Sequence, residues 1–341
     1  MERKKKRRLR WIMDTRPPIN QPTQGSASGR FVSQESSIGQ PQRRPHPDID
    51  AHVKHLVNDL KSSSVQVQRE AAAGLRVLSR HDPEKRIAIA ENGAISPLVD
   101  LLKSTDSMCQ ENAVTALYNL SINDNNKAAI AHAGAIEPLI HVLGNGSPEV
   151  RQNAAAALYS LSFAEEIKLK IGRSGAILPL VELLDNGTPR GKKDAVTALF
   201  NLSTAQENRI KIVQGGAVKH LITLMDPATG LGDKAVTAVL ANLAATPEGC
   251  FEIGREGGVI PLVDVVELGS AKGKECAAAA LLLLCISRDI YCHIVLREGI
   301  VPSLIVLAMT GTPRAKDKAR QLLTYLRNYQ RAVAQAEPGR G

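Results

Sequence analysis

The chain has 341 residues and a formal net charge of +9, and 43% of its residues are hydrophobic while only 3% are aromatic. Residues 1–47 contain 11 Lys and Arg against 3 Asp and Glu, so this segment carries a net +8 and the other 294 residues carry only +1. A body wrapped in nucleic acid needs a basic stripe across its folded surface, so this distribution disfavours nucleic acid as a partner. No apolar run of about 18 residues occurs, which disfavours a membrane span.

The N-terminal segment 1–48 begins with the basic run KKKRR, which comprises Lys4, Lys5, Lys6, Arg7 and Arg8. A run rich in Pro, Gln, Ser and Gly follows, and such a composition cannot bury enough apolar area to order itself. We therefore expect a disordered basic tail. The run KKKRR can be a nuclear-import signal, a solvated segment or an intramolecular ligand for the folded part of the chain.

Five cysteines occur without any paired spacing, which indicates reduced thiols in a cytoplasmic or nuclear protein.

A phrase of the form GAIEPLI recurs at a constant interval from residue 93 onwards. Its glycines are separated by 41, 41, 41, 41 and 42 residues: Gly93, Gly134, Gly175, Gly216, Gly257 and Gly299. A second phrase, AVTALYNLS with its variants, keeps the same interval. This period is too long for the helical repeats of roughly 33 and 34 residues and leaves the armadillo and HEAT classes of solenoid.

Each unit divides into three helices at its turn residues. A short helix ends at the glycine of the first phrase, and a second helix follows with a proline in its first turn, such as Pro138. The third helix opens at a capped turn such as Ser147–Pro148. Within this helix one buried stripe is expected at i, i+3, i+4 and i+7: Ala113, Ala116, Leu117 and Leu120. The pattern predicts an all-α protein.

A short first helix, a glycine and two longer helices form the armadillo plan rather than the two-helix HEAT plan. Residues 49–328 therefore resemble a right-handed armadillo-repeat superhelical solenoid, with a half unit at 49–81 as a cap and six full units. We expect residues 329–341 to form a C-terminal tail. Units such as AGAIEPLIHVLGNGSPEVRQNAAAALYSLS resemble the armadillo region of plant U-box proteins. A U-box, with its CPI-like start and DPV-like core, is not found in residues 1–48.

One position of the third helix is polar in the middle units and apolar at both ends of the array. The aligned residues are Val77, Asn119, Ser160, Asn201, Asn242, Leu283 and Tyr325. Equivalent positions stack along one face of a solenoid, and small residues such as Thr115 and Thr197 lie one turn earlier. An Asn amide suits the N–H and C=O groups of an extended peptide. The alternative is that each Asn bonds to nearby backbone of its own chain.

Basic residues gather where the third helices of the third and fourth units begin: Arg190, Lys192, Lys193 and Lys234. They form a solvated rim or receive an acidic or phosphorylated segment. Armadillo proteins of the nuclear-import type are similar, but they place a Trp one turn before each such Asn. Here the only tryptophan is Trp11, so a receptor for basic cargo is disfavoured.

These patterns predict a non-enzymatic, monomeric scaffold that binds an extended segment of a partner protein in a concave groove. We expect no cofactor, no metal and no small-molecule substrate. The resemblance implies a role in ubiquitination-linked or receptor-kinase signalling. The alternative that it implies is the substrate-recognition part of a U-box type ubiquitin-protein ligase.

Overall fold

The structure is a computed structural model that describes residues 47–226, 229–230 and 232–336. The run KKKRR and the rest of residues 1–46 lie outside the described residues. Within the described part of the chain, all regular secondary structure is helical. The N-terminal half unit consists of α2 (Pro47–Asp59) and α3 (Val65–Ser79), which correspond to the second and third helices of a full unit.

Six full units follow, each with three helices in chain order. The first helices are α4 (Pro83–Glu91), α7 (Asp124–His132), α10 (Glu165–Arg173), α13 (Gln206–Gln214), α16 (Pro247–Arg255) and α19 (Asp289–Arg297). The second helices are α5 (Ile95–Leu101), α8 (Ile136–Asn145), α11 (Ile177–Asn186), α14 (Ala217–Leu224), α17 (Val259–Leu268) and α20 (Val301–Thr310). The third helices are α6 (Ser107–Ser121), α9 (Pro148–Leu161), α12 (Pro189–Ser203), η2 with α15 (Gly232–Val236 and Thr237–Leu243), α18 (Ala271–Ser287) and α21 (Pro313–Ala336).

The turn residues of the repeat set these helix boundaries. All six glycines of the first phrase have a left-handed backbone, with φ between 70° and 88°, a region that strains any residue with a side chain. At the start of α9 the Ser147 hydroxyl accepts from Val150 N–H, and Thr188 caps α12 through Gly191 N–H. Pro148 follows the first of these caps, where its missing N–H costs no hydrogen bond. The all-α armadillo solenoid expected from the sequence is confirmed.

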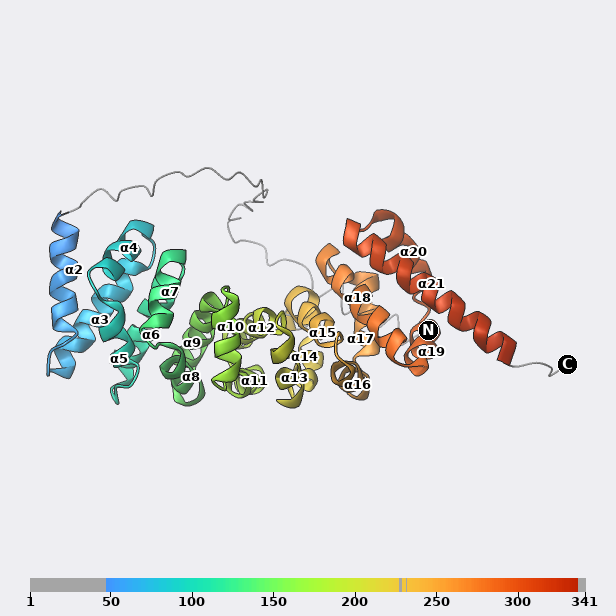
Figure 1. Cartoon of the computed structure of the whole chain (residues 1–341), viewed down its shortest axis with the longest axis horizontal. Helices are drawn as coiled ribbons and strands as arrows, with labels where there is room; N and C mark the ends of the chain where they lie inside the picture. Colours follow the sequence, from blue (N-terminus) through green and yellow to red (C-terminus); the bar gives the residue numbers. More distant parts are fainter. Residues whose placement is uncertain (1–46, 227–228, 231, 337–341) are drawn as a thin grey trace.

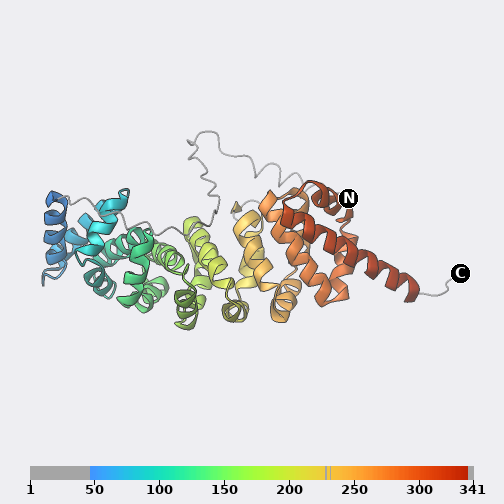
Figure 2. The same ribbon diagram turned by 45° about the horizontal axis from the view of Figure 1, so that its top comes forward.

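The units follow one another along the long axis of the molecule, from α2 at one end to α21 at the other (Figure 1). Third helices of successive units contact one another directly, so that they form one row from α3 to α21. The same succession is visible after the molecule is turned (Figure 2). One continuous hydrophobic core runs beneath this row, and the expected stripe of α6 belongs to it, with Leu117 and Leu120 fully buried.

Two third helices depart from the regular plan. In the fourth unit the Ser/Thr–Pro start is absent, and a π-helical turn, η2, precedes a short α15. The last helix, α21, continues to Ala336, past the boundary that the sequence placed at residue 328. Its buried positions are Ala315, Ala319, Leu322 and Leu326. The exposed remainder is rich in Arg, Gln and Ala, which favour helix without any need for packing.

Candidate functional site

The Asn position of the third helices points back toward the preceding unit. In each of three junctions the side-chain amide Nδ2 donates to the hydroxyl of a serine that ends the preceding third helix. The three bonds are Asn119–Ser79 (3.2 Å), Asn201–Ser162 (2.7 Å) and Asn242–Ser203 (2.9 Å). The two partners are 39 or 40 residues apart in sequence, so each bond joins two units rather than two turns of one helix.

The three accepting serines and Ser121, which holds the same position in the first unit, are fully buried, and each donates to the carbonyl three residues earlier in its own helix. These second bonds are Ser79 to Arg76 O (3.1 Å), Ser121 to Tyr118 O (2.7 Å), Ser162 to Tyr159 O (2.7 Å) and Ser203 to Phe200 O (2.7 Å). In Ser79, Ser162 and Ser203 the hydroxyl therefore satisfies a carbonyl at a helix end while it accepts from the next unit. We call this chain of bonds the Asn–Ser relay.

Ser160 takes the place of Asn in the second unit. Its hydroxyl donates to the backbone carbonyl of Ser121 (2.7 Å) instead of the Ser121 hydroxyl. Because the serine side chain is shorter than that of asparagine, it bonds to the main chain of the preceding helix. The junction between α6 and α9 thus keeps a buried polar link with a different donor.

The relay stops between the fourth and fifth units, where both partners are missing. Ala244 occupies the position of the accepting serine, and Leu283 occupies the position of the donating Asn. Leu283 packs against the hydrophobic core, as does Tyr325 in the last unit. An Asn at residue 283 would face no acceptor, and an unpaired polar group is costly to bury. The two changes are therefore physically linked.

The relay uses only part of each asparagine. The Nδ2 of Asn119 has two acceptors, Arg76 O and the Ser79 hydroxyl, so both of its N–H groups are engaged. Asn201 and Asn242 each retain one N–H, and the Oδ1 of all three accepts no hydrogen bond from a described residue and is not sealed from solvent. The interpretation that a peptide binds these groups stays a prediction. A bound peptide could use only those amide atoms that do not already bond to the preceding unit.

A second polar row lies about two turns earlier on the same helices. Asn153 Nδ2 donates to the hydroxyl of Thr115 in the preceding unit (2.9 Å). At the next junction the corresponding residues are Asp194 and Ala156, so no hydroxyl is available. One oxygen of Asp194, Oδ2, accordingly lacks a hydrogen bond and lies 3.5 Å from Arg190 Nε. Burial raises the pKa of Asp194, and the neighbouring cations only partly oppose that shift.

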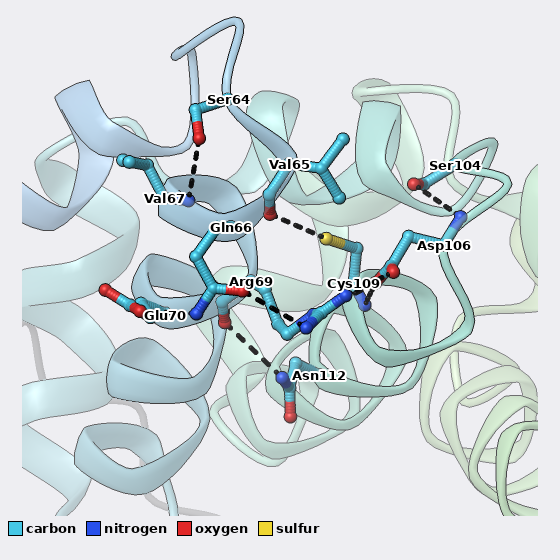
Figure 3. Close-up of polar contacts among 10 residues, drawn as sticks. All are labelled: Ser64, Val65, Gln66, Val67, Arg69, Glu70, Ser104, Asp106, Cys109 and Asn112. Atoms are coloured by element: carbon cyan, nitrogen blue, oxygen red, sulfur yellow. Dashed lines mark hydrogen bonds and ion pairs between the residues drawn. The ribbon is translucent and has the colours of Figure 1, made fainter.

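The junction between the half unit and the first unit shows this row in detail (Figure 3). Asn112 Nδ2 donates to the backbone oxygen of Arg69 (3.4 Å), and the Arg69 guanidinium forms an ion pair with Asp106 (2.6 Å). Asp106 also caps α6, because its Oδ1 accepts from the backbone N–H of Cys109 (2.8 Å). The Arg69 hydrogen bond, followed by the bond from the Cys109 backbone, lowers the pKa of Asp106 to about 2.

The basic residues singled out from the sequence do not all face the same way. Arg190 leans back over α9, where its Nη2 donates to Asn153 Oδ1 (3.1 Å). Lys192 turns to the second-helix layer and donates to the backbone oxygen of Asp185 (2.7 Å). Lys193 and Lys234 are exposed.

The small residue one turn before Asn201 stays close to its own helix. The Thr197 hydroxyl donates to the backbone oxygen of Lys193 (2.8 Å). This bond folds the hydroxyl back onto α12, and Thr197 is half-buried.

A pocket of about 290 Å³ opens on the face formed by the third helices. Residues of four successive third helices line it: Arg76 and Val77 of α3 with Arg80 directly after its end, Thr115, Tyr118 and Asn119 of α6, Asn153 of α9, and Arg190 of α12. Packed helices lie roughly 8–10 Å apart, so side chains of α3 and α12 can share one pocket only where the face is hollowed. We call this site the arginine pocket.

Sequence reasoning identified only part of this pocket. It singled out Thr115, Asn119 and Arg190, and it did not single out Arg76 or Arg80. The signal that could have found the two arginines lies in the degenerate half unit, RVLSR. Full units place other residues at these two positions, such as Tyr118 and Ile122 in the first unit.

Other kinds of site were sought in the same residues. Across residues 47–226, 229–230 and 232–336, no three His, Cys, Asp or Glu side chains gather as a group that could hold a metal ion. In that same part of the chain no single helix is long and apolar enough to cross a membrane. Helices α19 and α20 meet the length and composition test only together, as a pair bent by 90°.

Comparison with known proteins places these features in a family. The model of the plant U-box protein ARM repeat region matches residues 52–335. U-box domain-containing protein 4 of Arabidopsis thaliana is 62% identical over 83 residues, which are 24% of this chain and 10% of the relative. E3 ubiquitin-protein ligase SPL11 of Oryza sativa subsp. japonica is 49% identical over 74 residues, 22% of this chain and 11% of the relative. The matched segments thus span about a tenth of these curated relatives.

Solved structures with the same architecture include designed proteins. A computationally designed armadillo repeat protein for modular peptide recognition is 30% identical with a TM-score of 0.62, covering 68% of this chain and 99% of the designed one. A designed armadillo repeat protein in complex with the peptide (KR)4 is 28% identical with a TM-score of 0.60, covering 68% of this chain and 99% of its own.

Proposed function

We propose that this chain, which belongs to the family of plant U-box protein ARM repeat regions, is a non-enzymatic scaffold that binds an extended segment of a partner protein. The segment lies across the face formed by the third helices, and it is acidic or phosphorylated. The chain acts as a monomer, without a cofactor or a small-molecule substrate. Its setting, by family, is ubiquitination-linked or receptor-kinase signalling.

The observation that carries this proposal is the hollowed third-helix face. It contains the arginine pocket at its N-terminal end and a row of amide groups with unused hydrogen-bonding capacity beyond it. An extended peptide offers backbone N–H and C=O groups at regular intervals, which such amides can pair with. Each neutral hydrogen bond contributes only about 0.5–1.5 kcal/mol net, so the charged groups must supply a large part of any micromolar affinity.

The charge of the face favours an acidic rather than a basic segment. The designed relative in complex with (KR)4 binds a peptide of Lys and Arg, whereas this chain presents Arg76, Arg80 and Arg190 in its pocket. Like charges brought together on binding cost free energy, and opposite charges steer association. The same argument disfavours the run KKKRR as a ligand for this part of the face.

Two fluorescein-labelled peptides of equal length, (ES)4 and (KR)4, test the proposal by fluorescence anisotropy. We expect (ES)4 to bind more tightly by about tenfold or more, with affinity that falls as salt rises. Thr197→Trp places a bulky side chain on the open face and should abolish this binding. Gln206→Trp, an exposed position on the first helix α13, is the matched control and should bind like the parent. Tighter binding of (KR)4 would overturn the proposed charge preference.

A second candidate function is the substrate-recognition part of a U-box type ubiquitin-protein ligase. It is favoured by the identity to U-box domain-containing protein 4, although the match covers only 10% of that relative. An in vitro ubiquitination assay separates the two candidates. Chain formation by the purified protein with a conjugating enzyme alone would refute the scaffold proposal, whereas chain formation only after a separate ligase is added would support it.

We propose that the run KKKRR is a nuclear-import signal. The protein would then be located in the cytoplasm, the nucleus or both. Replacing Lys4, Lys5, Lys6, Arg7 and Arg8 by alanine in a fluorescent fusion tests it. Loss of nuclear fluorescence is the expected result. An unchanged distribution would favour the interpretation of the run as a solvated segment.

A further inference from the structure

We infer that the arginine pocket binds a phosphoserine or phosphothreonine side chain of the bound segment. This inference rests on the proposed function and adds to it the chemical class that one position of the partner must have. A phosphate group carries a charge of about −1.5 to −2 at neutral pH and offers three acceptor oxygens. A carboxylate offers two oxygens in one plane and is satisfied by a single bidentate arginine.

Two of the three arginines are held in place by bonds that leave other donors unused. Arg76 Nη1 donates to Glu111 Oε1 (2.9 Å) and to Asn112 Oδ1 (3.0 Å). Arg190 Nη2 donates to Asn153 Oδ1 (3.1 Å). A guanidinium has five N–H donors in a rigid fork, so each arginine keeps donors for a ligand after these bonds are made. Their side chains are therefore pre-oriented, which lowers the entropy lost on binding.

Arg80 supplies charge that no carboxylate of the described residues neutralises. Its side chain is exposed, and its guanidinium makes no hydrogen bond or ion pair within the described part of the chain. Only its main chain is engaged: the N–H donates to Val77 O (3.3 Å), and the backbone oxygen accepts from Arg86 Nη2 (2.8 Å). The residue is thus anchored through its main chain while its charged end is available at the rim of the pocket.

The balance of charge at the pocket is positive. Among the described residues, three arginines line it and no carboxylate does. The nearest anions stand behind the arginines: Glu111 pairs with Arg76, and Asp194 lies beside Arg190. Asp194 lies 3.5 Å from Arg190 Nε and is not among the residues that line the pocket. A dianionic group can therefore enter without displacing an existing ion pair.

Size and surroundings fit a phosphorylated side chain on an extended segment. The volume of about 290 Å³ is roughly ten times the share of one water molecule in the liquid, enough for a phosphate group and its bridging waters. Tyr118 also lines the pocket, and a tyrosine hydroxyl can donate to a phosphate oxygen. Val77, 72% exposed, forms an apolar wall on which an apolar residue next to the phosphorylated one can pack.

The pocket is particular to the N-terminal end of the row. Arg76 and Arg80 belong to the half unit, and the full units have no arginine at these two positions. The segment that binds the third-helix face is thereby fixed in register, since only one place along the face has this arrangement of arginines.

Degenerate peptide libraries test the inference, with a fixed central phosphoserine, serine or aspartate in otherwise matched pools immobilised on beads. We expect the phosphoserine pool to retain the parent protein about tenfold more strongly than the serine pool, and clearly more than the aspartate pool. Arg80→Gln should reduce the ratio of phosphoserine to serine binding to less than about threefold. Because Arg80 is exposed, this variant should melt like the parent. Arg297→Gln, an exposed arginine of α19 outside the face, is the charge-matched control and should keep the full ratio.

The outcomes separate this inference from the proposed function. Equal binding of the phosphoserine and serine pools, still abolished by Thr197→Trp, would overturn the phosphate site and leave the scaffold proposal standing. Equal binding of the phosphoserine and aspartate pools would overturn the phosphate class in favour of a carboxylate. A full phosphoserine preference in Arg80→Gln would place the site elsewhere. No binding to any pool would count against both proposals.

Discussion

The third helices of the first four units and those of the last two stack against their neighbours with different chemistry. From α3 to α15, every junction contains a buried polar link, either an Asn amide on a serine hydroxyl or the Ser160 hydroxyl on a main-chain oxygen. From α15 to α21 the same positions hold Ala244, Leu283, Cys285 and Tyr325, which belong to the hydrophobic core or pack against it. Successive third helices contact one another in both regions.

The difference teaches that the relay works as a pair of residues in neighbouring units. A buried hydroxyl or amide is acceptable only while its partner is present, so the loss of Ser at 244 accompanies the loss of Asn at 283. A hydrogen bond also has a preferred geometry that an apolar contact lacks. We therefore expect the polar half to be more sensitive to changes in register and the apolar half to tolerate repacking.

Leu283→Asn should produce the largest effect, because it places the amide of the polar half where no acceptor exists. We expect a loss of about 2–4 kcal/mol from the lost apolar contacts and the unpaired amide. Chemical denaturation monitored by circular dichroism measures it. Adding Ala244→Ser supplies the missing hydroxyl and should recover about 1 kcal/mol. No recovery in the double variant would show that the relay depends on more than its two side chains.

Thiol labelling should show that this damage stays in the apolar half. Cys285 and Cys292 are fully buried there, and Cys109 is fully buried in the first unit. Each unit contacts mainly its neighbours, so local opening need not spread along the array. In Leu283→Asn the labelling of Cys285 and Cys292 by iodoacetamide should accelerate by about tenfold or more, while that of Cys109 should not change. Mass spectrometry measures the labelling rate of each thiol. Equal acceleration of all three thiols would indicate that the array opens as one unit.

Asn119→Ala should destabilise the polar half by about 1–3 kcal/mol, because it removes the donor to the Ser79 hydroxyl and one of the two side-chain donors to Arg76 O. Ser79→Ala removes the other side of the same bond. In a double-mutant cycle the two effects should add up to more than the effect of the double variant. Additive effects would mean that the bond contributes nothing to the free energy of unfolding.

The ion pair between Arg69 and Asp106 should give the smallest effect, and one that depends on pH. The folded-state pKa of Asp106 is about 2, below its ordinary value of 3.8, so its stabilisation is present above pH 3.8 and is lost as the pH falls through about 2. Asp106→Asn keeps a capping side chain but removes the charge. The melting temperatures of the parent and this variant should differ at pH 7 and converge near pH 2. A constant difference at all pH values would exclude the ion pair as its cause.

Regular periodicity made the fold readable in the sequence. The interval of 41 residues is visible in the sequence itself. The glycines that need a left-handed backbone and the Ser–Pro and Thr–Pro helix starts depend on a few neighbouring residues, so they can be interpreted without a three-dimensional structure. The start of the third helix in the fourth unit was harder to predict from the sequence. Its sequence lacks such a start, and a π-helical turn, η2, precedes α15 there.

The sequence by itself determined the three-helix unit, the number of units and the polar stripe of Asn119, Ser160, Asn201 and Asn242 along one face. Only the tertiary structure decided what those amides do, because their partners lie about 40 residues away and are chosen by how one unit stacks on the next. The arginine pocket has the same origin. Arg190 is separated from Arg76 and Arg80 by more than one unit, and only the hollowed row of third helices brings them to one site.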